Sequence, residues 1–513
     1  MATANADTRV LLAAPSRLDS DVERRCSFSS SEPEYSRTAA SMYALTYVVP
    51  TVVFGFFLWR GRRDPVYILA LPLLLGYGRS IFLDTYSLHL TVGGGVAVNE
   101  NDLSLMALLV VFAYVRAIRP TASPERVSLQ LYLCAGLLIL LTAKAFAVGS
   151  QSWTDVASPS HLYVAAKAGA VARVWFYLPL SIMLWHLVLK RFSGHEILDL
   201  LRILTWVTVA CCVVYFANLA GVKTYTSIWQ AYSTTDAPGG VGVFRDYLFI
   251  PGWLNVALAY SLAQLVYGKE RATYFPVAAI VTACALFTFT RSIGLCAVGL
   301  WVVAILWRAV VIPVRGRSTG RGEAIGSARV TFAMSVFASV FAAMVLRWST
   351  LTAWWAYLGL RMGALSTGVT GDPNTAMRVS LLGRAAEIVS HEGFFLGTLM
   401  TSTGSAGGVY FLDSYWAAVL VSFGWLGLFL TGGLVVTALA EATLRGLRAD
   451  AGSAILSLTI LFGLLMTVVL SMTGAGWVAA ATTGAFLLAA PDVRFRITPS
   501  PPSVAGPAGI AGR

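Results

Sequence analysis

Charged residues are scarce in this sequence. Asp, Glu, Lys and Arg make up 12% of its 513 residues, against roughly a quarter in soluble domains. Hydrophobic residues make up 57%, and the mean hydropathy is +0.71. This composition excludes an ordinary soluble protein. It predicts an all-α, polytopic integral membrane protein.

Cysteine is also scarce, and its positions exclude a disulfide framework. One of the six cysteines lies in a polar segment, and the others lie inside apolar runs, where a thiol acts as a small hydrophobic group. No Cys/His cluster has the spacing of a metal site, so neither a metal nor a cofactor is expected. The basic residues that give the net charge of +12 are scattered over loops, which argues against nucleic acid as a partner. The cysteines in apolar runs are Cys134, Cys211, Cys212, Cys284 and Cys296.

Apolar segments of bilayer length follow one another along the chain. A helix needs about 17–25 apolar residues to cross a membrane. We predict about twelve or thirteen spans, near 41–59, 65–83, 103–118, 128–148, 170–189, 203–221, 246–267, 274–290, 292–313, 329–346, 411–437, 454–472 and 474–490.

These spans divide the chain into five regions. A polar tail at 1–40 is expected to be disordered, and no cleavable signal peptide is visible in it. The first ten spans occupy 41–346, and a large extracytoplasmic loop occupies 347–410. The last three spans occupy 411–490, and a Pro/Gly/Ala-rich tail at 491–513 is expected to be disordered.

The orientation follows from the Lys and Arg residues of the short loops. If the spans alternate, one side of the membrane receives basic groups at 60–63, 116–126, 190–191, 269–271, 315–321, 445–448 and 494–496. That side is predicted to be the cytoplasm. The opposite side receives the N-terminus and the loops 84–102, 149–169, 222–245 and 347–410.

The predicted outer side nevertheless keeps several cations within or near its spans. They are Arg79, Lys144, Arg173, Arg245, Arg291, Arg347, Arg361, Arg378 and Arg384. An Arg or Lys at mid-span costs about 2.5–3.5 kcal/mol on insertion scales, and less near the interface. Their retention indicates that the outer side handles an anion. The alternative is that each side chain snorkels to the headgroups.

The large outer loop contains an amphipathic helix near 373–391. Asp372 has the chemistry of a helix cap, and Pro373 suits the first helical position. Apolar residues recur at helical spacing on one face, and polar residues occupy the opposite face. The apolar set is Leu381, Leu382, Ala385, Ile388 and Val389, and the polar set is Ser380, Arg384, Glu387 and His391. Arg378 lies on the apolar side. A helix of this kind between two spans is typical of the lid of a polar site.

Four motifs, in order along the chain, carry a resemblance to a known family. They are Asn101-Asp102-Leu103 before an apolar run that ends in Arg116; Arg245 followed by FIPGWLNVALAYSL; Phe287-Thr288-Phe289-Thr290-Arg291-Ser292; and Arg378 with its helix, followed by Gly397, Gly404 and Asp413-Ser414-x-Trp416. With these motifs the chain resembles the O-antigen polymerase and ligase superfamily, the Wzy-type bacterial membrane glycosyltransferases. Asp413-Ser414 stands where ligases usually have His-Asn, which favours a polymerase.

The resemblance implies a metal-independent enzyme of the bacterial inner (cytoplasmic) membrane. Such an enzyme transfers an oligosaccharide from a polyprenyl-pyrophosphate donor to an acceptor glycan or lipid at the outer face, in O-antigen, capsule or exopolysaccharide assembly. Membrane lipids, a flippase and chain-length regulator proteins are its expected partners. The alternatives are a ligase of the same superfamily and a non-enzymatic flippase or exporter. A further one is a polyprenyl-phosphate sugar transferase that uses Asp84, Glu100 or Asp102.

Arginine suits a pyrophosphate, because its planar fork bonds two phosphate oxygens and stays charged. The candidates for this role are Arg291, Arg378, Arg245 and Arg384. Each also has a plain structural interpretation. Arg291 can be a helix-end snorkel, Arg245 can pair with Asp246, and Arg384 can pair with Glu387 one helical turn away.

The acceptor hydroxyl calls for a base, and three residues are candidates. His391 has a suitable intrinsic pKa, although it can equally cap the end of its helix. Asp413 occupies the family's position, although it can equally cap the span that follows it. Glu387 is the third candidate.

Overall fold

The structure is a computed structural model, and the part of the chain that it describes is predominantly helical. The described residues are 51–76, 90–92, 96–98, 100–119, 128–153, 175–219, 254–287, 291–311, 352, 356, 373–391, 393–397, 405–406, 409–410, 414–448, 451–472 and 481–493. The predicted tail at 1–40 and the predicted span at 329–346 lie outside them.

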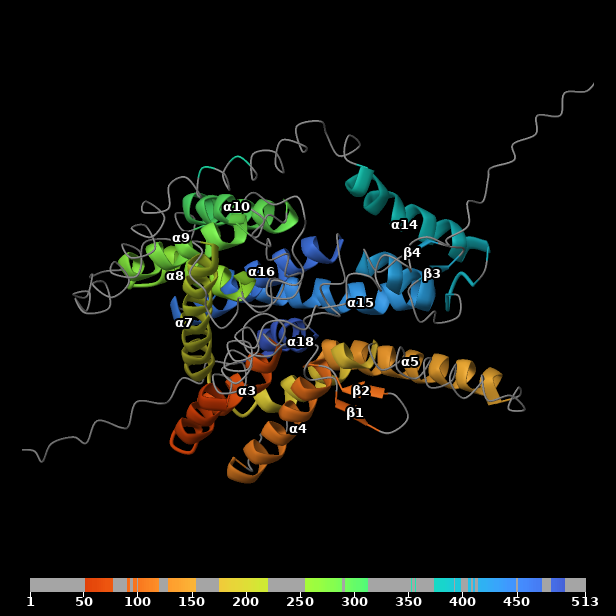
Figure 1. Ribbon diagram of the computed structural model, residues 1–513, viewed down its shortest axis with the longest axis horizontal. Coiled ribbons are helices and arrows are strands. Elements are labelled where there is room, and N and C mark those ends of the chain that lie inside the picture. Colours follow the sequence, from red (N-terminus) through yellow and green to blue (C-terminus); the bar gives the residue numbers. More distant parts are fainter. Residues whose placement is uncertain are drawn as a thin grey trace, which may run out of the picture. The chain divides into compact units, whose positions relative to one another are not determined.

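Helices follow one another along the chain (Figure 1). In order they are Thr51–Gly61, α3 (Val66–Gly76), α4 (Glu100–Ile118), α5 (Leu129–Trp153), Trp175–Leu189, α7 (Gly194–Leu219), α8 (Asn255–Tyr267), α9 (Arg271–Phe287), α10 (Arg291–Leu306), α14 (Pro373–His391), α15 (Tyr415–Arg448), α16 (Ala451–Met472) and α18 (Ala481–Ala489). A π-helical turn, η4 (Trp307–Val311), follows α10, and a 3-10 turn, η5 (Ala490–Asp492), follows α18. Each predicted span that falls within the described residues overlaps one of these helices.

Five described helices are long and apolar enough to cross a membrane. Their apolar stretches are Asn101–Ile118, Leu129–Phe146, Ile293–Val311, Tyr415–Leu447 and Gly452–Ser471. Shorter apolar helices occur at Thr51–Gly61, Val66–Leu75, Trp175–Leu189 and Arg271–Phe287. The prediction of a helical membrane protein is confirmed. The number of spans and the side on which each loop lies stay predictions.

Two short antiparallel strand pairs accompany the helices. β1 (Leu90–Val92) pairs with β2 (Val96–Val98), and β3 (Ser405–Ala406) pairs with β4 (Val409–Tyr410). The sequence between the strands is Gly-Gly-Gly in the first pair and Gly-Gly in the second, and glycine favours tight hairpin turns. The all-α prediction therefore omitted two small hairpins, both in segments predicted to be outer loops.

α7 begins at Gly194, earlier than the span predicted to start near 203. Its start is a capping box. The Ser193 backbone N–H donates to the Glu196 carboxylate over 2.7 Å, and the Glu196 N–H donates to the Ser193 hydroxyl over 3.3 Å. These reciprocal bonds satisfy backbone donors that the first turn of a helix leaves without partners.

The core of the described part is centred on α8 and α16, which pack against each other. From Asn255 to Gln264 every residue of α8 is buried, so this helix is covered by protein on all sides. Most of α16 is buried in the same way. All five cysteines predicted to act as small hydrophobic groups are buried and unbridged: Cys134, Cys211, Cys212, Cys284 and Cys296.

α5 and α15 pack side by side and antiparallel (Figure 1). A Cβ atom at Gly427 would lie 3.7 Å from Leu140, and one at Gly136 would lie 3.3 Å from Leu430. One at Gly433 would lie 3.4 Å from the Leu133 side chain. Each step forward along α5 thus matches a step back along α15. Small residues let membrane helices approach closely in this way.

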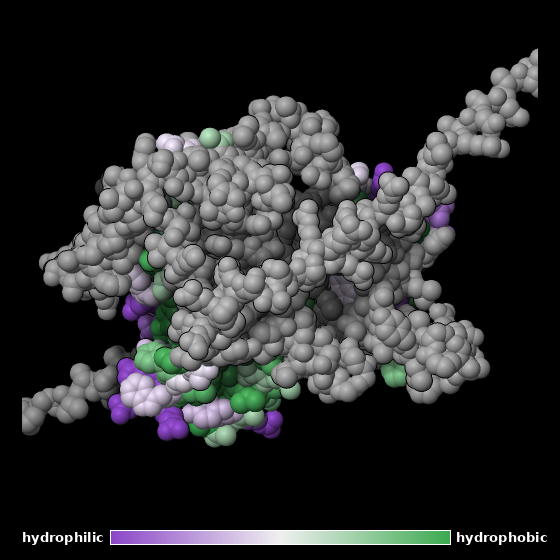
Figure 2. Space-filling model, viewed as in Figure 1, coloured by the Kyte–Doolittle hydropathy of each residue, from purple (hydrophilic) through white to green (hydrophobic). Residues whose placement is uncertain are grey.

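Large apolar side chains also cover parts of the exterior. Figure 2 shows green side chains gathered on the part of the surface formed by the helix Thr51–Gly61 and α4. The most exposed apolar residues of these two helices are Val52, at 64%, and Val110, at 68%. Apolar surface of this extent marks an interaction with a membrane or a partner, and the bilayer length of α4 favours a membrane.

Candidate functional site

α14 is present over the predicted bounds and is amphipathic. Leu381, Ala385 and Val389 are buried in a small apolar cluster with Ala417, Ala418, Leu420 and Val421 of α15. Leu382 is an exception to the predicted apolar face, because it is 39% exposed. The interface holds α14 against the first part of α15, before the break described below.

The polar face of α14 points away from that cluster. Arg384, Glu387 and His391 all have exposed side chains, spaced three and four residues apart along the helix. Among the ion pairs of the described residues, none joins Arg384 to Glu387, so the predicted local pair is not formed. The candidate cation and the candidate bases are thus accessible on one surface.

The other predicted site residues are described less fully or not at all. Arg291 is the first residue of α10, and Arg378 lies in the second turn of α14. Arg245 and Asp413 lie outside the described residues. Asp413 directly precedes Ser414, whose carbonyl accepts a hydrogen bond from the Ala418 N–H over 3.0 Å, so α15 begins close to its predicted start.

A break at Gly424 divides α15 into two parts. Gly424 has φ 64° and ψ −164°, which no helical residue has. The Trp425 N–H donates to the Phe394 carbonyl over 3.1 Å, and the Leu426 N–H donates to the Phe395 carbonyl over 3.2 Å. These amides begin the second part of α15. The segment that follows α14 therefore supplies the acceptors that the interrupted helix lacks.

Three glycines with positive φ form this junction: Gly393 (112°), Gly397 (71°) and Gly424 (64°). A Cβ atom at Gly397 would lie 2.6 Å from the backbone nitrogen of Gly424, and one at Gly424 would lie 2.5 Å from the Phe395 carbonyl oxygen. The two backbones meet at a distance that only glycine permits. We call Gly393–Gly397 with Gly424 the glycine junction.

Lys144 of α5 also reaches the glycine junction. Its ammonium donates to the Gly397 carbonyl over 3.1 Å. The sequence identified Lys144 only as one of the outer cations. Its local sequence does not predict a contact with Gly397, which lies 253 positions further along the chain. The contact brings together α5, the end of the α14 segment and the break in α15.

Aromatic residues pack beside α14 at the start of α15. The Trp175 ring lies 6.0 Å from the Tyr415 ring and 5.0 Å, edge to face, from the Phe423 ring. Tyr177, two residues after Trp175 in the same helix, donates its hydroxyl to the carboxylate of Asp102. Asp102 belongs to the first of the four family-like motifs. Asp102 of α4 thus contacts the helix Trp175–Leu189, whose Trp175 packs against α15.

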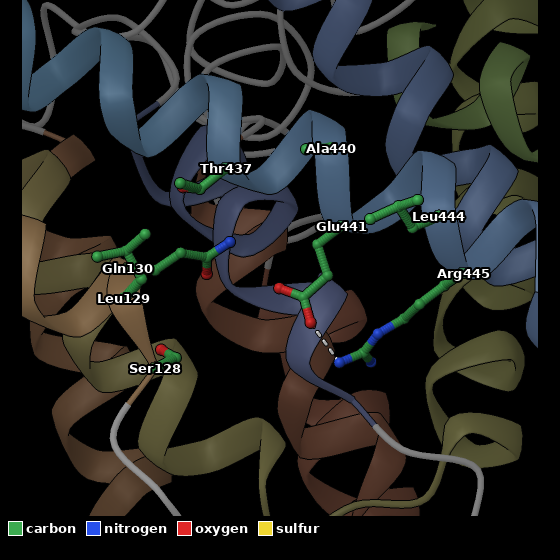
Figure 3. Close-up of a pocket in the computed structure, with 8 residues that line it drawn as sticks. All are labelled: Ser128, Leu129, Gln130, Thr437, Ala440, Glu441, Leu444 and Arg445. Carbon is green, nitrogen blue, oxygen red and sulfur yellow. Dashed lines mark hydrogen bonds and ion pairs between the residues drawn. The ribbon is translucent and has the colours of Figure 1, made fainter.

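A cavity of about 470 Å³ lies at the other end of the α5–α15 pair (Figure 3). Figure 3 shows the Gln130 amide and the Glu441 carboxylate directed into the same space, with Glu441 paired to Arg445. Arg445 also donates to the Val493 carbonyl over 2.9 Å. Because its one cation is already paired, this cavity does not offer an anion site. It contains none of the predicted site residues.

Among the described residues, no group of three or more His, Cys, Asp and Glu side chains could hold a metal ion. A comparison of the chain with protein-family models, with curated proteins and with solved structures finds no match.

Proposed function

We propose that the chain is a membrane glycosyltransferase of the O-antigen polymerase and ligase type. It would transfer an oligosaccharide from a polyprenyl-pyrophosphate donor to an acceptor glycan at the outer face of the bacterial inner membrane. The observation that carries the proposal is the exposed polar face of α14. This helix is docked on a membrane-length helix and presents Arg384, Glu387 and His391 together on an accessible surface.

The state of Arg384 supports the anion-binding part of the proposal. Within the described residues its guanidinium is not neutralised by Glu387, so its charge can act on an anionic ligand. An arginine binds a phosphate through two parallel hydrogen bonds, and such donors act strongly where water is partly excluded. Arg378 and Arg291, at the helix positions given above, are proposed to complete the pyrophosphate site. Arg245 is a further candidate for the pyrophosphate, and Asp413 is one for the base.

Contacts between loops support the proposed orientation. Arg119 binds the Glu196 carboxylate over 2.7 Å and the Arg191 carbonyl over 2.9 Å. Arg308 donates to the Leu265 carbonyl over 3.1 Å. In each case, both partners come from loops or helix ends for which the basic-residue pattern predicts the same, cytoplasmic, side. The Lys144–Gly397 contact joins the part of α5 that is predicted to lie near the outer face to the loop that is predicted to lie outside.

A transporter is the second candidate, because broken helices are common at transporter binding sites. In those proteins the free amides at the break face a substrate or an ion. At Gly424 the amides of Trp425 and Leu426 are instead bonded to Phe394 and Phe395. The break is thus occupied by the chain itself, which favours the enzyme. The Asp413-Ser414 sequence in place of His-Asn favours a polymerase over a ligase.

Deletion of the gene tests the proposal. Surface and secreted polysaccharide would be separated on gels, and the lipid-linked intermediates would be extracted and sized. A polymerase predicts single repeat units on the lipid carrier and loss of long chains. Long chains stranded on the carrier would instead identify a ligase. Unchanged polysaccharide and unchanged intermediates would contradict both.

Arginine variants test the pyrophosphate site in the deletion strain. Arg291→Ala and Arg378→Ala are expected to abolish polymer formation, with protein levels in the membrane unchanged. Lysine at either position should restore little activity, because an ammonium lacks the planar fork. Arg62→Ala, in an exposed turn far along the chain from these motifs, is the matched control and should leave polymer length unaltered. Full activity in both alanine variants would contradict the assignment.

A further inference from the structure

Three consecutive large apolar residues are exposed directly after α14. Phe394 is 50% exposed, Phe395 is 70% exposed and Leu396 is 51% exposed. They lie within the glycine junction, between Gly393 and Gly397. A run of this kind is unfavourable in water, and contiguous exposed apolar surface marks a binding surface. We call Phe394–Leu396 the apolar tip.

The apolar tip is continuous with the exposed stripe of α15. The Phe394 ring lies 6.1 Å from the Trp425 ring and 5.1 Å, edge to face, from the Phe395 ring. Trp425 is itself 40% exposed, and Phe429, one turn further along α15, is 71% exposed. The tip and this stripe therefore form one apolar surface.

Exposure and length together indicate where the lipid-facing part of α15 begins. Every residue of Tyr415–Phe423 is buried, and exposed apolar residues recur only after the break at Gly424. The stretch Trp425–Leu447 is roughly 34 Å long at 1.5 Å per residue, close to the hydrocarbon thickness of about 30 Å. The whole of Tyr415–Leu447 would be roughly 50 Å long, which is too long for the hydrocarbon core. The lipid-facing part of α15 thus begins at Trp425, at the level of the tip.

Backbone carbonyls in and beside the tip accept hydrogen bonds from protein donors. Backbone groups in hydrocarbon need protein partners, because no water is present there. The carbonyls of Phe394 and Phe395 accept from the Trp425 and Leu426 amides. The Gly393 carbonyl accepts from the Gly397 amide over 2.7 Å, and the Gly397 carbonyl accepts from Lys144. A loop in water would have no need of so many internal acceptor contacts.

We propose that the apolar tip inserts into the lipid bilayer at the interface on the α14 side and anchors the end of α14 to the membrane. The occupant of this surface is lipid. Trp425 lies at the depth that Trp side chains favour, and Phe394 and Phe395 supply apolar rings beside it. Lys144 of α5 lies at the same level, because its ammonium donates to the Gly397 carbonyl. The anchor is independent of the reaction that the protein performs.

Spin labelling in lipid nanodiscs tests the anchor. Cys26→Ser is the parent, since the five described cysteines are buried. A nitroxide is attached to Phe395→Cys, and its collisions with oxygen and with a water-soluble nickel chelate are measured. Ser390→Cys, on the exposed face of α14, is the control for water. Val436→Cys, 64% exposed on α15, is the control for lipid.

The expected result is an oxygen-to-nickel collision ratio at position 395 shifted from the Ser390→Cys value toward the Val436→Cys value. Leu396→Cys should give the same shift, so the test can still be made if Phe395→Cys does not fold. A ratio at 395 equal to that of Ser390→Cys would overturn the proposal, because the tip would be in water. Low collision rates with both reagents would also overturn it, because the tip would then be covered by protein.

Discussion

At the scale of single residues, the glycine junction depends on backbone conformations that side chains exclude. Gly424, with φ 64° and ψ −164°, lies in a region that is essentially limited to glycine. Its surroundings add a second restriction, because a Cβ atom would lie 2.5 Å from the Phe395 carbonyl oxygen and 2.6 Å from the Gly397 nitrogen. Backbone atoms cannot move aside as a flexible side chain can. The chain therefore needs glycine at this position to dock the segment after α14.

Gly424→Ala is expected to destabilise the protein. The unfavourable conformation alone costs about 1–3 kcal/mol, and the displaced backbone adds to that cost. Gly432→Ala is the matched control, since it lies inside the same helix and a Cβ atom there would meet nothing within 4 Å. The control should be neutral or more stable by about 0.5–1 kcal/mol. Thermal unfolding of the purified variants in detergent compares them, and equal Tm values would contradict the prediction.

Glu196 gives a prediction of pH dependence. Burial raises the pKa of this carboxyl, but hydrogen bonds from Arg119 and Ser193 outweigh burial, so the pKa lies below its ordinary value. A carboxyl whose folded pKa is lowered stabilises the fold above the unfolded pKa of about 4.3, and this contribution is lost as the pH falls through the folded pKa.

The wild-type protein should therefore have a higher Tm than Glu196→Gln at about pH 7, and the difference should shrink as the pH is lowered through about 4. Thermal unfolding of both proteins across this range, at constant ionic strength, measures it. A Tm difference that does not change with pH would show that the charge of Glu196 does not stabilise the fold.

At the scale of elements, α14 is held on α15 by a narrow apolar face. Leu381 is 1% exposed, whereas its neighbour Leu382 is 39% exposed. Leu381→Ala should weaken docking by about 2–5 kcal/mol, the usual cost of truncating a buried leucine. Leu382→Ala applies the same change outside the interface and should cost much less. Hydrogen exchange of the α14 amides is the measurement. Equal loss of protection in both variants would contradict the interface.

The positions of the helices could be predicted from the sequence because they follow from local patterns. Apolar length located the described spans, and the cap and period around Pro373 predicted the bounds and the buried face of α14. The Ser193-x-x-Glu196 pattern of a capping box is also visible in the sequence. It would have predicted the start of α7 at Gly194 instead of near 203.

The glycine junction could not be predicted, because local sequence does not distinguish Gly424 from its neighbours. Gly427, Gly432 and Gly433 lie in the same apolar run and stay helical. Only the contacts with Phe394–Gly397 make Gly424 the place of the break. The missing ion pair between Arg384 and Glu387 is a similar case, because spacing on a helix permits a pair and does not enforce one.

At the scale of the whole molecule, contacts connect the helix ends that the basic residues predict to be cytoplasmic. The Trp307 ring N–H donates to the Tyr267 hydroxyl over 2.9 Å, so the end of α10 lies beside the end of α8. A Cβ atom at Gly446, near the end of α15, would lie 3.7 Å from Trp307. The end of α15 in turn lines a cavity with Ser128 at the start of α5. These ends therefore lie close together, as the predicted common side of the membrane requires.

This arrangement makes the predicted span at 329–346 testable. α10 ends beside the other ends that are predicted to be cytoplasmic, whereas α15 begins at its opposite end, next to α14. We therefore expect the chain to cross the membrane between α10 and α14, where the span at 329–346 is predicted. In the Cys26→Ser background, Ser390→Cys on α14 should react with a membrane-impermeant maleimide on intact spheroplasts. Lys269→Cys, in the exposed turn between α8 and α9, should react only after permeabilisation. Labelling of both positions on intact spheroplasts would contradict the span at 329–346. Labelling of both only after permeabilisation would contradict that span and also the outer position of Arg384, Glu387 and His391, on which the proposed reaction depends.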